Sequence, residues 1–448
     1  MQSQFLERAL HQIEEAYHID PELYAKFDVK RGLRNADGSG VLAGLTKISS
    51  VVGFKKTEAG IEPVDGRLYY RGININEIVE GIQKERRHGF AEVAYLLLLG
   101  RLPNKQELEE FDQYLRSRRT LDEEVLTSQI LHLPSNNVMN QLQRTVLALY
   151  VLDKNADDVS IANVLRQSLE IVAKFPTIIA YALHARNHWF HGQSLFIHLP
   201  DPELDLAENF LYMLRPDGKF TPLEAEILDL ALILHAEHGG GNNSTFTMHV
   251  VTSSWTDTYA AVAAAISSLK GPLHGAANAN VMDMMQNIKE NVKDWNDQEE
   301  VASYIEKILR KEAHNRTGLV YGMGHAVYTK SDPRALILRE KARELAAEKG
   351  RLDEFNLYRA VETLTPEIFR RVKKSNKVIS ANVDFYSGFV YDMLGFPKEI
   401  YTPLFAMARI VGWSAHRMEE LISGGRIIRP SYKSVAEVRH YVPLDQRG

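Results

Sequence analysis

The 448-residue chain has no cysteine, no marked excess of charge of either sign and no long apolar run. Without cysteine it can form neither disulfides nor thiolate metal sites. Its 53 Lys and Arg against 58 Asp and Glu give a formal charge of −5, which does not favour nucleic acid as a partner. The longest apolar run, residues 260–266, is far below the roughly 18 residues that span a membrane. With no signal or transit pattern at the N-terminus, a cytoplasmic globular protein away from membranes is expected.

Helical periodicity dominates what is present. Apolar residues at three- and four-residue spacing predict helices near 4–17, 91–99, 105–117, 139–152, 161–184, 222–238, 256–269, 299–314, 334–349 and 400–421. Strand signals are limited to Ser49–Gly53 and Leu68–Arg71. We expect a small hairpin turning at Asp65-Gly66, because Asp-Gly supplies a left-handed turn. The predicted fold is all-α with this minor N-terminal β-hairpin.

The domain boundaries are weakly marked. Gly271-Pro272 breaks a helix of small residues, and a polar, turn-rich stretch covers residues 373–382. The stretch between them is more charged and less apolar than its flanks. We therefore predict a small domain over 276–385, inserted into a larger helical domain formed by 1–275 and 386–448.

Two histidine clusters could carry chemistry. His235 and His238 are three residues apart, so a helix would place them on one face before Gly239–Gly241 ends it. This pattern fits a ligand site, or equally a capped helix end where histidine suits the dipole. His274 lies in the tight segment Gly271–Gly275, where glycine lets the backbone approach a ligand; an exposed loop histidine is the alternative.

Arginine and aspartate mark two more clusters. His325 follows the Gly322-Met323-Gly324 turn, and Arg334 falls in the first turn of a helix that Ser331-Asp332-Pro333 should start. A cation at that end opposes the helix dipole, which points to an anionic partner, unless the side chain simply faces solvent. Asp384 lies among aromatic residues, where burial would raise its pKa and suit a general base; capping a helix near Ser387 is the alternative.

Two further arginines complete the pattern. Arg409 lies on an apolar predicted helix, where a charge needs a partner, and Arg429 lies in the C-terminal segment. Three His, one Asp and three Arg imply a small polyanionic substrate and proton transfer that require no metal and no redox cofactor.

These segments resemble the citrate synthase family in order and spacing. The resemblance rests on GMGHAVYTKSDPR (322–334), GPLHG (271–275), LHAEHGGGN (234–242), NVDFYSG (382–388), MARIVGW (407–413) and IRP (428–430). Upstream, GVLAGLTKISSVVG, GRLYYRG and FAEVAYLLLLGRLP are also similar, so the likeness runs from about residue 40 onward. It implies an all-α homodimer whose small domain closes over the substrates oxaloacetate and acetyl-CoA.

By resemblance, each cluster acquires a role. Asp384 matches the base that removes a methyl proton, His274 the donor to the enolate oxygen, and His325 the group that polarises the oxaloacetate carbonyl. The expected contacts with oxaloacetate or citrate are His238, Asn242, Arg334, Arg409 and Arg429, the last reaching in from the other subunit. The expected CoA contacts are Leu273, Gly322, Gly324 and Lys330. Acetyl-CoA is a substrate, so no cofactor is expected.

The chain departs from common family patterns at three positions. Glu237 stands where Asp is frequent, Gly239 where an acid is frequent, and Thr329 where some members carry an Arg near the CoA phosphates. Lys330 is adjacent to Thr329 and could substitute for that Arg.

Other functions compete with this reading. A 2-methylcitrate synthase would run the same reaction on propionyl-CoA, and one added methylene is worth only about 1–3 kcal/mol in an apolar pocket. A metal hydrolase would use His235, Glu237 and His238 as ligands, although HxEH is not the HExxH pattern. A catalytically silent helical binding protein is the third alternative.

Overall fold

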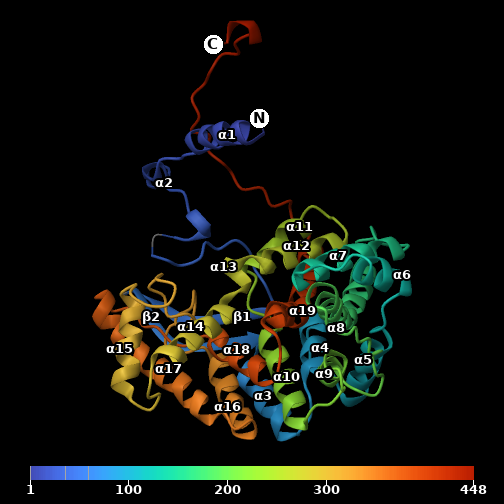
Figure 1. Cartoon of the computed structure of the whole chain (residues 1–448). Helices are drawn as coiled ribbons and strands as arrows, with labels where there is room; N and C mark the ends of the chain where they lie inside the picture. The colour runs from blue at the N-terminus through green and yellow to red at the C-terminus, as the bar shows by residue number, and fades with distance from the viewer. Residues whose placement is uncertain (1, 36, 59, 448) are drawn as a thin grey trace. The chain divides into compact units, whose positions relative to one another are not determined.

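The computed structural model describes residues 2–35, 37–58 and 60–447. It is helical apart from one three-stranded sheet, which confirms the predicted fold class (Figure 1). The α-helices are α1 (Gln2–Ala16), α2 (Pro21–Lys26), α3 (Ile75–Lys84), α4 (Phe90–Leu99), α5 (Lys105–Ser117), α6 (Glu123–Val125), α7 (Val138–Leu149), α8 (Ile161–His191), α9 (Leu206–Leu214), α10 (Pro222–His235), α11 (Asn243–Thr252), α12 (Thr258–Lys270), α13 (Pro272–Gly275), α14 (Ala277–Asn291), α15 (Gln298–Leu309), α16 (Pro333–Glu348), α17 (Leu352–Lys373), α18 (Val383–Met393) and α19 (Tyr401–Ile422). The strands are β1 (Ser49–Thr57), β2 (Gly60–Tyr70) and β3 (Ile73–Asn74). None of the helices in the described residues is both long enough and apolar enough to cross a membrane.

The chain divides into two compact units, residues 1–45 and 46–448. The first unit contains α1 and α2, and Asp20 begins α2 by accepting a hydrogen bond from the backbone N–H of Glu22. The second unit contains the sheet and all the remaining α-helices. The small domain predicted over 276–385 stays a prediction.

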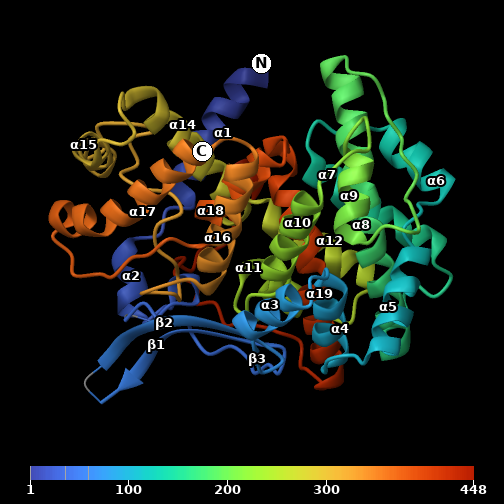
Figure 2. The same cartoon turned by 90° about the horizontal axis from the view of Figure 1, so that it is seen from below.

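The hairpin does not turn where the sequence analysis placed it. β1 and β2 are antiparallel from Ser49↔Tyr70 to Thr57↔Gly60, so Asp65 and Gly66 lie inside β2 and the predicted turn is wrong. Gly66 serves a close approach instead: a Cβ there would lie 2.1 Å from the carbonyl oxygen of Ser331. Figure 2 shows the hairpin beside α16, which contacts β2.

Helix α10 also ends earlier than predicted. A capping box begins it, because Thr221 accepts from the N–H of Glu224 while the Glu224 carboxylate accepts from the N–H of Thr221. It ends at His235 rather than at residue 238, so His235 and His238 do not share a helix face. The segment after His235 leaves the helix because Glu237 takes its hydrogen bonds from Gly239, Ser49 and His416.

Several helices escaped the periodicity analysis: α3, α9, α11, α14, α17 and α18. For α18 the reason is burial. It is buried on almost every side, from Phe385 to Tyr391, so its sequence has no polar face with a 3.6-residue period. Its cap is Asn382, whose side chain accepts from the N–H of Asp384; Asp384 therefore lies in the first turn and is not the cap.

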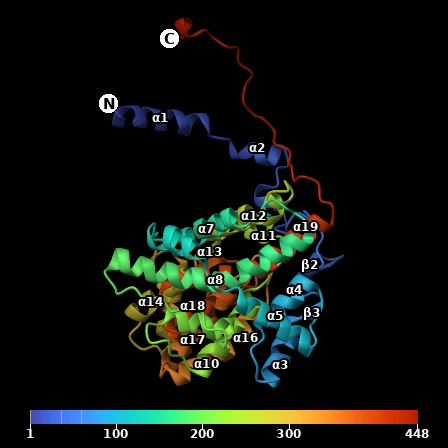
Figure 3. The same cartoon turned by 90° about the vertical axis from the view of Figure 1, so that its right-hand side faces the viewer.

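Helix α19 is the centre of the second unit. It contacts α4, α8, α10, α11 and α12, and Figure 3 shows it beside α4 and the long α8. Every residue from Ala406 to Met418 is buried, including Arg409, His416 and Arg417. Buried charged groups need polar partners, so the core around this helix must supply hydrogen-bond acceptors and opposite charges.

Candidate active site

His325 is held by a loop that the segment before Asp384 fixes in place. Gly324 donates from its N–H to the carbonyl of Ser380, and Asn382 donates back to the carbonyls of Gly322 and Gly324. Gly322 has φ 76° and Gly324 has φ 95°, values that favour glycine. These contacts tie His325 to the start of α18, although the two are distant in sequence.

Two backbone N–H groups decide which ring nitrogen of a neutral His325 carries the proton. Its Nδ1 accepts hydrogen bonds from the N–H groups of Val327 (3.0 Å) and Tyr328 (3.1 Å). An atom that accepts two N–H bonds carries no proton, so the neutral ring has its proton on Nε2. The ring centroid lies 5.1 Å from that of His238 and 4.8 Å from that of Tyr328.

Arg334 is buried and paired with Asp332. The Asp332 carboxylate accepts from the Nε (3.0 Å) and Nη2 (2.8 Å) of Arg334 and from the N–H of Val383 (3.1 Å). Asp332 thus joins the starts of α16 and α18, and it is the cap predicted for the helix at 333. Burial lowers the pKa of Arg334, but Asp332 and Tyr328 more than offset this, so its pKa is raised. The sequence analysis assigned no site role to Asp332.

Asp384 has the electrostatic setting that the sequence analysis expected of a base. Burial raises the pKa of its carboxyl to about 6, and Asp332 adds to the rise. Arg334 and Arg409 act against it. The group therefore carries a proton in part of its population just below neutral pH.

His274 lies in the short helix α13 and is half-buried. Its Nε2 lies 3.1 Å from the hydroxyl oxygen of Ser244, which also accepts from the indole N–H of Trp413 (3.2 Å). Burial and the charge of Arg409 lower the pKa of His274 to about 4, so the ring is neutral at pH 7. Gly275 allows the chain to turn tightly here, because a Cβ would lie 1.9 Å from the carbonyl oxygen of Leu269.

The positive charge of Arg409 influences several other groups of the site. The residue is buried, and its Nε donates to the carbonyl of His235 at 2.7 Å. It influences the pKa of His238, His274 and Asp384, so all three lie within its electrostatic reach. The buried ring of His238 lies 3.3 Å from the Tyr328 hydroxyl, and burial with Arg334 holds its pKa well below the usual value.

Asn242 also adjoins this cluster, whereas five predicted site residues lie on its margin or beyond it. The side-chain oxygen of Asn242 accepts from Ser244, the hydroxyl that contacts His274. Leu273, in α13 next to His274, and Lys330, in the loop after His325, are exposed. Gly322 and Gly324 shape the His325 loop. Arg429 is exposed in the segment after α19 and takes no part in the contacts above.

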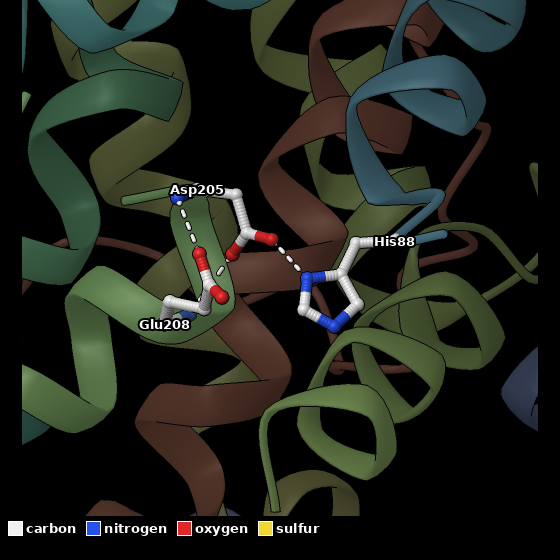
Figure 4. A group of neighbouring side chains, drawn as sticks. All are labelled: His88, Asp205 and Glu208. Carbon is white, nitrogen blue, oxygen red and sulfur yellow. Dashed lines mark hydrogen bonds and ion pairs between the residues drawn. The ribbon is translucent and has the colours of Figure 1, made fainter. Parts of the chain in front are cut away.

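The metal-hydrolase alternative lacks a ligand cluster. His235 bonds through Nε2 to the Tyr391 hydroxyl (2.8 Å), and Glu237 bonds to Ser49, Gly239 and His416. Within the described ranges, the one His, Asp and Glu grouping close enough to share an ion is His88, Asp205 and Glu208 (Figure 4).

That grouping has a structural explanation. Asp205 and Glu208 form the capping box of α9, each carboxylate accepting the other residue's N–H, and His88 Nδ1 bonds to Asp205. It adjoins a cavity of about 920 Å³ whose lining includes none of the site residues discussed above.

Comparisons with known proteins agree with the resemblance. A family model described as citrate synthase, C-terminal domain, matches residues 36–431. A citrate synthase of Synechocystis is 36% identical, covering 89% of this chain and 93% of the relative. The 2-methylcitrate synthase 2 of Corynebacterium glutamicum is 33% identical, covering 94% and 98%. The citrate synthase of Thermoplasma acidophilum, solved with carboxymethyl coenzyme A and oxaloacetate, has a TM-score of 0.75 and 27% identity, covering 94% and 99%.

Proposed function

The chain belongs to the citrate synthase family, and from this premise we propose that it condenses acetyl-CoA with oxaloacetate and hydrolyses the resulting citryl-CoA to citrate and CoA. One observation carries the assignment of the site. Arg409 acts on His238, His274 and Asp384 together, and the His325 loop is hydrogen-bonded to the segment that begins α18. Groups from distant segments thus lie within reach of one another, which supports the proposed roles of acid, base and anion-binding group.

The first step needs a base and an enolate stabiliser together. The Asp384 carboxylate removes a proton from the methyl group of acetyl-CoA; the C–H bond breaks and its electron pair moves to the thioester oxygen. Neutral His274 donates a hydrogen bond to that oxygen, and a donor of this kind is typically worth roughly 3–4 kcal/mol. For Nδ1 to carry the proton that is donated to the substrate, Nε2 must accept from the Ser244 hydroxyl, so that hydroxyl turns from Asn242 to His274 when the substrate binds.

The second substrate is oriented by cations and polarised by His325. The Nε2–H of His325 faces the ketone oxygen and transfers its proton as the enolate carbon attacks the carbonyl carbon. Arg334 and Arg409 bind the carboxylates of oxaloacetate, with His238, Asn242 and Arg429 of a second copy completing the contacts. Such orientation lowers the entropic part of the barrier. Leu273, Gly322, Gly324 and Lys330 contact CoA.

The assay that tests this function measures release of the free CoA thiol with and without oxaloacetate. We expect release from acetyl-CoA to require oxaloacetate and to survive chelator treatment. A higher kcat/KM with propionyl-CoA would instead make the protein a 2-methylcitrate synthase, a function that some of its relatives carry by name. Activity lost to a chelator and restored by zinc favours the hydrolase, and no oxaloacetate-dependent release favours the silent binding protein.

We also propose that the enzyme is cytoplasmic and forms a homodimer. The dimer is proposed because the family resemblance implies that Arg429 reaches into the active site of the partner copy. Light scattering after size-exclusion chromatography should give twice the chain mass of 50.8 kDa. A monomer with full activity contradicts the role of Arg429.

A further inference from the structure

Four buried or half-buried ionisable groups form a hydrogen-bonded row behind the site. Glu420 Oε2 lies 2.8 Å from His249 Nδ1, His249 Nε2 lies 3.1 Å from His416 Nδ1, and His416 Nε2 lies 3.0 Å from Glu237 Oε1. The side chains of His416 and Glu237 are fully buried. The row joins α11 and α19 to the segment that carries His238. The proposed reaction assigns no task to any of the four.

The hydrogen bonds of this row need one more proton than two neutral histidine rings supply. Two carboxylates end the row, and both accept hydrogen bonds when ionised. Three bonds along the row then need three N–H groups, whereas two neutral imidazoles provide only two. A protonated Glu420 would also bring one extra proton. The intact row therefore carries a single additional proton, which is lost as the pH rises.

The extra proton is placed by the surroundings of the two rings. Burial and the charge of His416 lower the pKa of His249, while the bond to Glu420 acts against this. Burial would raise the pKa of Glu237, but His416 and Arg409 hold it well below the usual value. The extra proton therefore lies on the ring pair that bonds to Glu237 at one end and to Glu420 at the other.

Glu237 links the row to the segment that carries His238. Its Oε1 also accepts from the N–H of Gly239 (2.5 Å) and from Ser49 on β1 (2.8 Å). Gly412 lets α19 come close, because a Cβ there would lie 2.2 Å from Glu237 Oε2. The anion therefore fixes the backbone on either side of His238, a proposed oxaloacetate contact.

We propose that the protonated His249–His416 pair is a positioning device: it holds Glu237, and with it the His238–Gly239 segment, in the geometry that binds oxaloacetate, so that loss of its shared proton weakens oxaloacetate binding. This inference rests on the proposed function of the site. Glu237 is the residue that replaces the Asp frequent in the family, and the longer side chain is the one that reaches His416 here.

The charges around the row favour keeping the proton. From α19, Glu419 lies 3.9 Å from His416 Nδ1 and Glu420 ends the row. Arg71, which follows β2, interacts electrostatically with Glu237 and Glu419. Arg409 lowers the pKa of Glu237, and Glu237 raises the pKa of Tyr70. The three carboxylates outnumber the two arginines, so the surrounding charges favour the proton, while burial of the rings opposes it.

The test compares the full-length enzyme with Glu420→Gln, His249→Gln and the control His132→Gln, which changes an exposed histidine outside the row. Kd for oxaloacetate is measured by calorimetry from pH 6 to 10, and kcat in parallel. In the unaltered enzyme Kd should rise by up to about tenfold per pH unit above the pH at which the proton is lost. Removing the Glu420 charge should move that rise to lower pH with kcat at its plateau unchanged. His249→Gln should remove the rise and leave Kd weaker at every pH, and His132→Gln should have no effect.

Each outcome separates the positioning device from the proposed function. A Kd independent of pH in the unaltered enzyme, or identical profiles in Glu420→Gln and the unaltered enzyme, overturns the inference while the synthase activity stands. Because His249 is partly buried, thermal unfolding checks that its variant folds; if it does not, the Glu420→Gln shift still decides. Failure to bind oxaloacetate at any pH, together with absent thiol release, removes the proposed function itself.

Discussion

Asp384→Asn is expected to lower kcat by about 10²- to 10⁴-fold, the usual contribution of a general base. The amide cannot take the methyl proton, yet it has nearly the same shape as the carboxyl. The cap of α18 is Asn382 and does not depend on the Asp384 side chain, so the helix should be retained. Kd for oxaloacetate should stay within about threefold, since the groups assigned to that substrate are untouched. Stopped-flow thiol release and calorimetry measure the two quantities.

The pH profile supplies the control for this variant. The base must be ionised, and burial raises its pKa to about 6. In the unaltered enzyme kcat/KM should therefore fall about tenfold per pH unit below pH 6, while the residual activity of Asp384→Asn should lack this limb. His274, with a pKa of about 4, stays neutral across this range and does not contribute. Normal turnover by Asp384→Asn, or an unchanged acid limb in it, contradicts the base assignment.

Arg334→Ala should cause two separate losses. Oxaloacetate loses a charge-assisted contact worth about 1.5–3 kcal/mol, so its Kd should rise by roughly 10- to 100-fold. The folded protein should also lose about 3–5 kcal/mol of its free energy of unfolding, because Asp332 is left as a buried, unpaired carboxylate. Calorimetry measures the first loss and chemical denaturation the second.

Two further variants separate these effects. Arg339→Ala, on the same helix, breaks partly exposed pairs with Glu340 and Glu362 and should cost no more than about 1 kcal/mol. Changing Arg334 and Asp332 together to Ala should recover part of the stability, since no buried charge is left alone, but should not recover oxaloacetate binding. If Arg334→Ala binds oxaloacetate normally, Arg334 is only a structural partner of Asp332.

The sequence predicted those features that depend on neighbours along the chain. The helix beginning at 333 has the expected Asp332 cap, and Arg334 is in its first turn. The period of apolar residues located α5, α7, α15 and α16, each with a solvent-facing side, although it missed α17, which also has one. It failed for α18, which has no such side, and for the Asp65-Gly66 turn, because the glycine there is needed for contact with Ser331, far along the chain.

The sequence alone determined the order of the motifs and hence the family, and it also set local caps such as Asp332. Tertiary structure decided which groups meet: that Asp332 neutralises Arg334, that Ser244 and Trp413 stand behind His274, and that Glu237 ends a row reaching Glu420. The physical reason is range. Capping and periodicity act within a few residues, whereas burial, pKa and the charge of a partner depend on side chains that only packing brings together.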